Sequence, residues 1–153
     1  MPNSNRARTM TENHECLMAL CDALEAVADS LPNNVDRQQC LLLSRALGPL
    51  LYRAQEMEEE QVFPVLLDLG RPRLDLAGTI ERLRIEHQID LCYAEEVQEM
   101  LKAYGEGRQT IAPDTAGFML RGFFECLRRH IAFEQELLAP LLELASTPTT
   151  ALN

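Results

Sequence analysis

Apolar side chains recur at steps of three and four residues in four segments of the chain, which is the spacing of an amphipathic helix. The first stripe consists of Met10, His14, Leu17, Cys21, Leu24 and Ala28, and the second of Leu43, Leu47, Leu50, Leu51, Ala54, Glu58 and Val62. The third consists of Leu76, Ile80, Leu83, His87, Leu91, Ala94, Val97 and Leu101, and the fourth of Phe123, Leu127, His130, Glu134 and Leu137. The periodicity predicts four helices and argues against a β fold.

Turn-forming residues between the stripes indicate where each helix begins and ends. Thr9 and Glu12 have the spacing of a capping box, and the stretch around Pro32 ends the first helix. The second helix is expected over about residues 36–69, the third over about 75–104 and the fourth over about 113–145. Pro49 is expected to bend the second helix and Pro64 to bend or end it, because proline has no amide hydrogen to donate.

The four predicted helices are joined by short turns, which is typical of an all-α, up-down-up-down four-helix bundle. A chain of 153 residues suits one domain. We expect residues 1–8 to be disordered or loose, residues 9–145 to form the bundle and residues 146–153 to be a frayed tail.

Composition narrows the set of partners. The formal charge of −10 argues against nucleic acid and against an anionic membrane surface, which both require clustered Lys and Arg. No apolar run approaches the roughly 20 residues of a membrane span, and the start of the chain lacks the apolar stretch of a secretory signal. The sequence therefore predicts a cytoplasmic protein.

The five cysteines, odd in number and without a C-x-x-C pair, are interpreted as small apolar residues within helices.

Five polar residues interrupt the apolar stripes at similar heights in the predicted bundle, namely His14, Glu58, His87, His130 and Glu134. Each has an ordinary structural explanation when it is taken alone. A histidine on an apolar face is commonly a hydrogen-bonded core residue, and both glutamates have arginines within reach in the sequence. Glu58 could pair with Arg53 or Arg84, and Glu134 with Arg128 or Arg129.

Taken together, the five residues favour a metal site. Buried carboxylates require compensation, yet the first helix carries no Lys or Arg between Met10 and Leu31. A metal ion compensates two carboxylates and three neutral imidazoles at once, and inward Glu and His side chains build carboxylate-bridged di-iron sites in other bundles. Donors of this kind without thiolate suit iron or manganese, and zinc also binds them.

The chain also repeats itself weakly. Glu58 and Pro64 recur at one common offset as Glu134 and Pro140, and at this offset Ala54 aligns with His130. The chain therefore resembles two helix pairs, each offering a histidine from its first helix and a glutamate from its second.

In this order and spacing the residues resemble the hemerythrin-like, or HHE cation-binding, family, whose simpler members show His, His-x-x-x-Glu, His and His-x-x-x-Glu across four helices. The corresponding segments here are His14, Ala54-Gln-Glu-Met-Glu58 followed by Phe63-Pro64, His87, and His130-Ile-Ala-Phe-Glu134. The resemblance implies a bundle that holds a non-haem di-iron centre. It also implies a role in dioxygen binding, in oxygen or iron sensing, or in handling peroxide or nitric oxide.

Two positions depart from the family pattern. Ala54 stands where the paired motif has a histidine, and Leu91 stands where metazoan oxygen carriers have another. Five protein ligands are therefore expected in place of six, with two irons as the first expectation and one as the alternative. Gln55 and Tyr52 are candidate substitute ligands, and Asp90 is a candidate partner that would orient an imidazole.

Two functional hypotheses follow. The first is a non-haem iron protein that binds or senses dioxygen, nitric oxide, peroxide or iron. The second, motivated by Ala54, is a metal-poor bundle that acts as an interaction or regulatory module. A classical di-iron enzyme is less favoured because Arg84 and Leu127 occupy the positions of a Glu-x-x-His pair, although weak oxidase, peroxidase-like or nitric oxide chemistry stays open. The oligomeric state, a homodimer included, is also left open.

Overall fold

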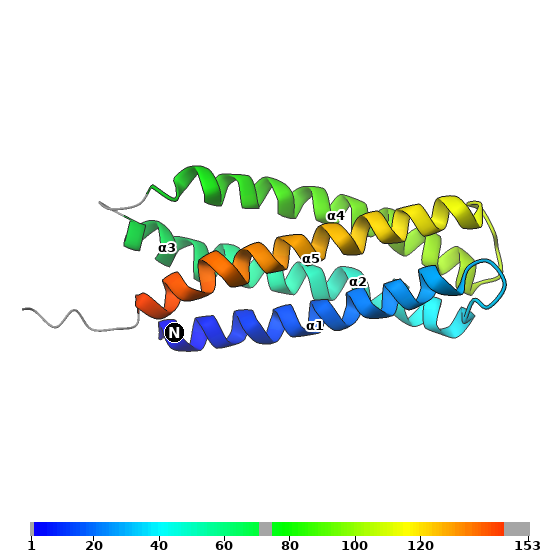
Figure 1. Cartoon of the computed structure of the whole chain (residues 1–153), viewed down its shortest axis with the longest axis horizontal. Coiled ribbons are helices and arrows are strands. Elements are labelled where there is room, and N and C mark those ends of the chain that lie inside the picture. The colour runs from blue at the N-terminus through cyan, green and yellow to red at the C-terminus, as the bar shows by residue number, and fades with distance from the viewer. Residues whose placement is uncertain (1, 71–74, 146–153) are drawn as a thin grey trace, which may run out of the picture.

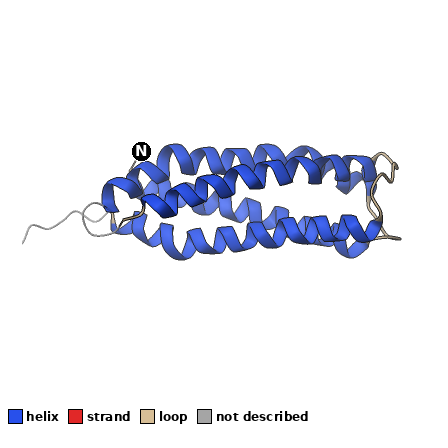
Figure 2. Ribbon diagram, turned by 90° about the horizontal axis from the view of Figure 1, so that it is seen from above, coloured by secondary structure: helices blue, strands red, loops and turns tan. Residues whose placement is uncertain are grey.

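Long antiparallel helices make up nearly the whole described chain in the computed structural model, which describes residues 2–70 and 75–145 (Figure 1). The elements are α1 (Asn3–Ser30), α2 (Arg37–Met57), the π-helical turn η1 (Glu58–Val62), α3 (Phe63–Gly70), α4 (Ala77–Gly105) and α5 (Pro113–Leu144). These described residues contain no strand. The prediction of an all-α four-helix bundle is confirmed (Figure 2), and α2, η1 and α3 together form its second rod.

The helices pack in two closely apposed pairs. α1 lies along α5, and α2 lies along α4, whereas α4 and α5 contact each other less extensively. The loops that join α1 to α2 and α4 to α5 lie at the same end of the bundle, on the right in Figure 1. The beginnings of α1 and α4, the whole of α3 and the end of α5 therefore share the other end.

The N-terminal boundary differs from the prediction. α1 begins at Asn3, so the expectation of a loose segment over residues 1–8 is wrong for residues 3–8, and Thr9 lies inside the helix instead of capping it. The physical reason is burial, because Ala7 and Met10 both pack into an apolar cluster at this end of the bundle. Residue 1 and the predicted frayed tail over residues 146–153 lie outside the described residues.

The second rod is interrupted at one place. α2 continues through Pro49, and the α-helical register changes only at η1, which ends at Val62, two residues before Pro64. Pro64, the second residue of α3, has no amide hydrogen to donate to a carbonyl one turn earlier. A π turn inserted in a helix frequently marks a functional position.

A polar layer divides the apolar core into two clusters. The larger cluster occupies the loop end and includes Leu17, Ala54, Ala94 and Leu127, and the smaller one occupies the other end and includes Met10. The smaller cluster also contains Met57, Val62, Phe63, Leu83 and Leu138. Along α1 the order is Met10, His14, Leu17, and α4 and α5 show the same succession of apolar, polar and apolar positions. The polar layer therefore lies inside the bundle, with apolar packing on both sides.

The cysteines differ in part from their interpretation. Cys21 and Cys40 are buried core residues, but Cys16, Cys92 and Cys126 are exposed because they lie on helix faces away from the apolar stripes. All five are free thiols. Within residues 2–70 and 75–145, none of the helices has the length and apolar character required to cross a membrane.

Candidate metal centre

The structure brings the five predicted side chains together in the polar layer. His14 comes from α1, Glu58 from the first position of η1, His87 from α4, and His130 and Glu134 from one face of α5. His130 and Glu134 share that face because residues four apart are neighbours on a helix. All five are buried, with exposed fractions between 0% for His14 and 9% for His130.

His14 contacts both carboxylates. Its Nε2 lies 3.1 Å from Oε1 of Glu58 and 3.0 Å from Oε2 of Glu134. One imidazole from α1 therefore links η1 to α5 across the bundle interior.

The remaining oxygens of the same carboxylates face the other two histidines. Nε2 of His87 lies 3.3 Å from Oε2 of Glu58 and 3.8 Å from Oε1 of Glu134, and Nε2 of His130 lies 3.1 Å from that same Glu134 oxygen. The ligand atoms of these four residues all lie within 4.8 Å of one another. Four nitrogen and oxygen donors thus converge from three elements.

Three of these converging atoms make only ion-pair contacts within this group and no well-oriented hydrogen bond, namely Nε2 of His87, Nε2 of His130 and Oε1 of Glu134. A buried polar atom without a partner costs about 1–3 kcal/mol, so three in one place need an explanation. A metal ion bound by all three would remove this cost, and the donor set of imidazoles and carboxylates suits iron, manganese or zinc. The residues present therefore fit a metal ion.

The far nitrogens of two histidines bind carboxylates. Nδ1 of His87 lies 2.7 Å from Oε1 of Glu59, and Nδ1 of His130 lies 3.0 Å from Oε2 of Glu86. A proton held on Nδ1 leaves the lone pair of Nε2 free to point into the centre, which is the tautomer that a metal requires. Glu59 and Glu86 thus favour the tautomer of His87 and His130 that metal coordination would need.

The sequence pattern does not reveal that Glu59 and Glu86 bind these imidazoles. Glu59 belongs to the acidic run at residues 56–60, which as a run is typical of a solvated face, and Glu86 immediately precedes His87 on α4 but reaches His130 on α5. The only available signal was the direct adjacency of each glutamate to a predicted ligand, and adjacent residues on a regular α-helix point in different directions.

The π turn explains how neighbouring glutamates serve the same imidazole. At η1, Glu58 points to Nε2 of His87 and Glu59 to Nδ1 of the same ring. The ring is further fixed by Phe63, which stacks on it with a centroid distance of 5.6 Å and an interplanar angle of 18°. The register change thus lets one short segment hold both nitrogens and one face of His87.

Among the described residues, the other named candidates form no hydrogen bond to the five central side chains. Asp90 is buried, with 5% exposure, but forms no hydrogen bond within the described chain, so the partner role expected of it belongs to Glu59 and Glu86. Tyr52 is 55% exposed and its hydroxyl donates to Glu56, so it is not placed to replace a ligand. Gln55 is buried with Oε1 unpartnered, outside the group of four converging residues.

No arginine serves the two central carboxylates within the described residues, where their ion-pair partners are histidines. Arg128 instead pairs with Asp22, Glu25 and Glu125, and Arg84 pairs with Glu81. The alternative explanation of the glutamates as arginine partners is therefore wrong for Arg84 and Arg128.

Contacts with the central carboxylates raise the pKa values of the histidines. Burial alone would lower the pKa of His14, but its hydrogen bonds to Glu134 and Glu58 outweigh burial and raise the pKa to about 9. The same opposition, with the carboxylates prevailing, raises the pKa of His87 to about 10. For Glu134, burial would raise the pKa, but the contacts with His130, His14 and His87 hold it well below the usual range. In the absence of a bound cation, the positive charge of protonated histidines thus offsets the negative charge of the carboxylates.

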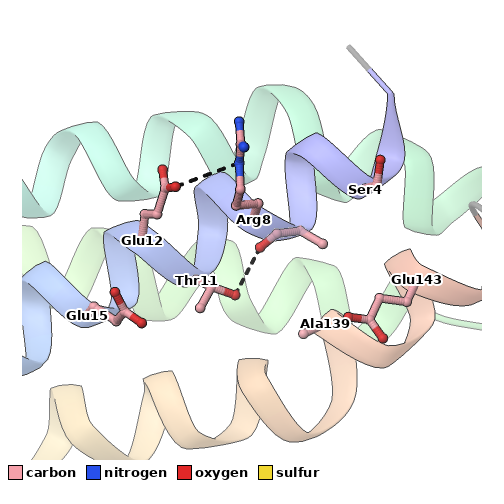
Figure 3. A pocket seen from close by; sticks show the side chains of 8 residues that line it. Ser4, Arg8, Thr11, Glu12, Glu15, Ala139 and Glu143 are labelled. Carbon is pink, nitrogen blue, oxygen red and sulfur yellow. Dashed lines mark hydrogen bonds and ion pairs between the residues drawn. The ribbon is translucent and has the colours of Figure 1, made fainter.

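Two surface hollows differ in their relation to the centre. One, of about 530 Å³, lies between α1 and the end of α5 and is lined by Arg8, Thr11 and Glu15, but contains none of the five residues (Figure 3). The other, of about 370 Å³, lies between α4 and α5, where these helices contact each other less. Its lining includes His130, Asp90, Cys126 and Arg129. The second hollow therefore connects solvent to the edge of the polar layer.

An all-α bundle with imidazoles and carboxylates from four rods gathered in its core has the architecture of a helical metal-binding domain. Residues 5–142 match the family model described as Hemerythrin HHE cation binding domain, and the chain belongs to this family. Neither a curated protein nor a solved structure matches the chain significantly.

Proposed function

We propose that this protein is a non-haem iron protein of the hemerythrin type that binds or senses a small ligand, with dioxygen and nitric oxide as the first candidates and peroxide or iron itself as further ones. The observation that carries the proposal is the convergence of three buried atoms of His87, His130 and Glu134 that form no well-oriented hydrogen bond. Membership of a cation-binding family supports it independently.

The donor set favours iron. Imidazole and carboxylate without thiolate suit iron and manganese, and an iron ion bound there would supply a Lewis-acidic, redox-active centre. The protein's own groups do the remaining work. Glu59 and Glu86 hold the Nδ1 protons of His87 and His130, and the two apolar clusters exclude bulk water from above and below the polar layer.

A small ligand has a short path to the centre. His130, the most exposed of the five, lines the hollow between α4 and α5. The hollow is too small for a macromolecular substrate but large enough for a diatomic ligand or peroxide. Access of this kind supports binding or sensing of a small molecule over a closed structural role.

A second candidate function is a metal-poor bundle that acts as an interaction or regulatory module. Ala54 favours it, because this buried residue supplies no donor where the family pattern has a histidine. The two functions make opposite predictions about iron, so one experiment separates them.

The experiment is anaerobic loading with ferrous iron at neutral pH, removal of excess metal, and measurement of iron per chain. The wild type is expected to retain iron, and Glu58→Gln is expected to lose most of it, because the variant side chain is neutral and a poor metal ligand. Glu60→Gln is the matched control, since Glu60 is an exposed member of the same acidic run. A wild type that retains no iron would favour the second function.

A further inference from the structure

Each central carboxylate divides its two oxygens between opposite sides of the polar layer. Oε1 of Glu58 and Oε2 of Glu134 face His14, whereas Oε2 of Glu58 and Oε1 of Glu134 face His87 and His130. The centre therefore has two sides that share the same carboxylates but differ in their imidazoles.

The two sides differ in how far their atoms are satisfied. On the His14 side, Nε2 of His14 makes hydrogen bonds of 3.1 and 3.0 Å to the two oxygens that face it, and the unsatisfied atom of this residue is its other ring nitrogen, Nδ1. On the other side, Nε2 of His87 and of His130 and Oε1 of Glu134 all lack hydrogen-bond partners. The ligand atoms that face the centre without a hydrogen bond therefore lie on the side of His87 and His130.

The sides also differ in the number of donors. The side of His87 and His130 offers four converging atoms, whereas the His14 side offers one imidazole nitrogen and two carboxylate oxygens. Ala54, one helical turn before Glu58, corresponds to His130 in the internal repeat as His14 corresponds to His87, so a donor at this position would join the His14 side; its methyl group instead packs in the larger apolar cluster. Only the side of His87 and His130 therefore supplies the four protein donors that a tetrahedral metal site needs.

We propose that the centre holds a single metal ion, on Glu58, His87, His130 and Glu134, and that His14 is a positioning residue which binds the outer oxygens of both carboxylates where a second ion would otherwise lie. This inference rests on the proposed iron-binding function and specifies its stoichiometry. His14 fixes the two carboxylates in the orientation that presents their inner oxygens to the metal, and Ala54 keeps the opposite side short of a ligand.

The first test is iron content together with electron paramagnetic resonance of the loaded and then oxidised wild type. About one iron per chain with the signal of an isolated high-spin ferric ion supports the inference. About two irons per chain in a spin-coupled pair, which suppresses that signal, would overturn it and leave the proposed function intact. Absence of bound iron would overturn the proposed function, and the inference with it.

The second test restores the missing donor. Ala54→His adds an imidazole on the His14 side and is expected to raise the content from about one to about two irons per chain. Arg53→His is the matched control, because it adds a histidine at the neighbouring exposed position of α2 and is expected to leave the content unchanged. A folded Ala54→His variant that still holds one iron would contradict the assignment of Ala54 as the missing ligand position.

The third test separates a positioning residue from a ligand. His14→Gln is expected to keep about one iron per chain with affinity reduced by about 10–100-fold, as for other residues that orient metal ligands. His130→Gln is expected to lose the ion. In the Ala54→His background, His14→Gln should return the content to about one iron, an effect that a purely structural role would not produce. If His14→Gln alone, shown by circular dichroism to be folded, loses iron as His130→Gln does, His14 is a ligand and the inference fails.

Discussion

Oε1 of Glu59 lies 2.7 Å from Nδ1 of His87, while the preceding residue, Glu58, faces Nε2 of the same ring. Two consecutive glutamates can hold opposite ends of one imidazole because the helix widens into a π turn at this point. A candidate metal ligand, Glu58, and the group that orients the facing imidazole, Glu59, are thus supplied by a single local irregularity.

This relationship predicts the effect of Glu59→Ala. Loss of the carboxylate frees the Nδ1 proton and the orientation of His87, and we expect the affinity for ferrous iron to fall by about 10–100-fold. Competition against a chromophoric chelator measures the change, and Glu60→Ala serves as the control. Equal affinities of the two variants would show that Glu59 does not prepare His87.

Iron is expected to stabilise the fold. An ion that binds only the native state, at a free concentration of about 100 times its dissociation constant, adds about 2.7 kcal/mol to the free energy of unfolding. For a domain of this size the melting temperature should rise by roughly 5–10 °C. Calorimetry with ferrous iron and with chelator measures the shift, and a metal-poor regulatory bundle would melt at the same temperature under both conditions.

The metal-free protein is expected to lose stability at alkaline pH. The pKa values of His14 and His87 are raised to about 9 and about 10, so the stability that their protonation contributes is complete below the unfolded value near 6.5. That contribution is lost as pH rises through the folded values. Glu134, whose pKa is lowered, contributes stability above its unfolded value near 4.5, and this is lost as the pH falls through its folded value.

Urea denaturation of the metal-free chain between pH 5 and pH 10 tests the alkaline limb, with His14→Gln as the comparison. The free energy of unfolding of the variant should decline less steeply with pH than that of the wild type. Parallel curves would contradict the contribution assigned to protonated His14. Iron binding should follow the opposite trend, because protons must leave the ligating imidazoles, so the affinity for iron should increase with pH.

The polar layer is expected to cost stability in the absence of metal. Replacement of all five residues by apolar side chains of similar volume should abolish iron binding and make the metal-free fold about 1–4 kcal/mol more stable. The proposed substitutions are His14→Leu, Glu58→Met, His87→Leu, His130→Leu and Glu134→Met. Urea denaturation of chelator-treated samples measures the difference, and a marked loss of stability would mean that the layer is a structural element of the fold.

The sequence predicted the helices well because their signal is repetitive and local. The stripe of α4 and the breaks around it placed that helix within two residues of its observed ends, and Pro113 opens α5 as expected. The beginning of α1 was predicted too late because a capping-box pattern at Thr9 outweighed the burial of Ala7, which depends on contacts with distant segments. The family resemblance drawn from five spaced residues is confirmed by the family match.

The features that the sequence did not reveal depend on three-dimensional geometry. The π turn has no compositional signal, and without it Glu59 reads as a solvated residue beside Glu58. Glu86 acts across the bundle on His130, a pairing that no spacing along α4 encodes. Asp90 shares the helical face of His87, which makes it a candidate partner in the sequence, although it forms no hydrogen bond to either imidazole in the described chain.

Anomalous X-ray diffraction at the iron edge, from crystals of the ferrous-loaded protein, locates the bound ion directly. We expect an anomalous peak inside the bundle, bounded by Nε2 of His87, Nε2 of His130, Oε1 of Glu134 and Oε2 of Glu58. Loaded crystals with no peak among these four atoms, or with iron only at the protein surface, would contradict this expectation.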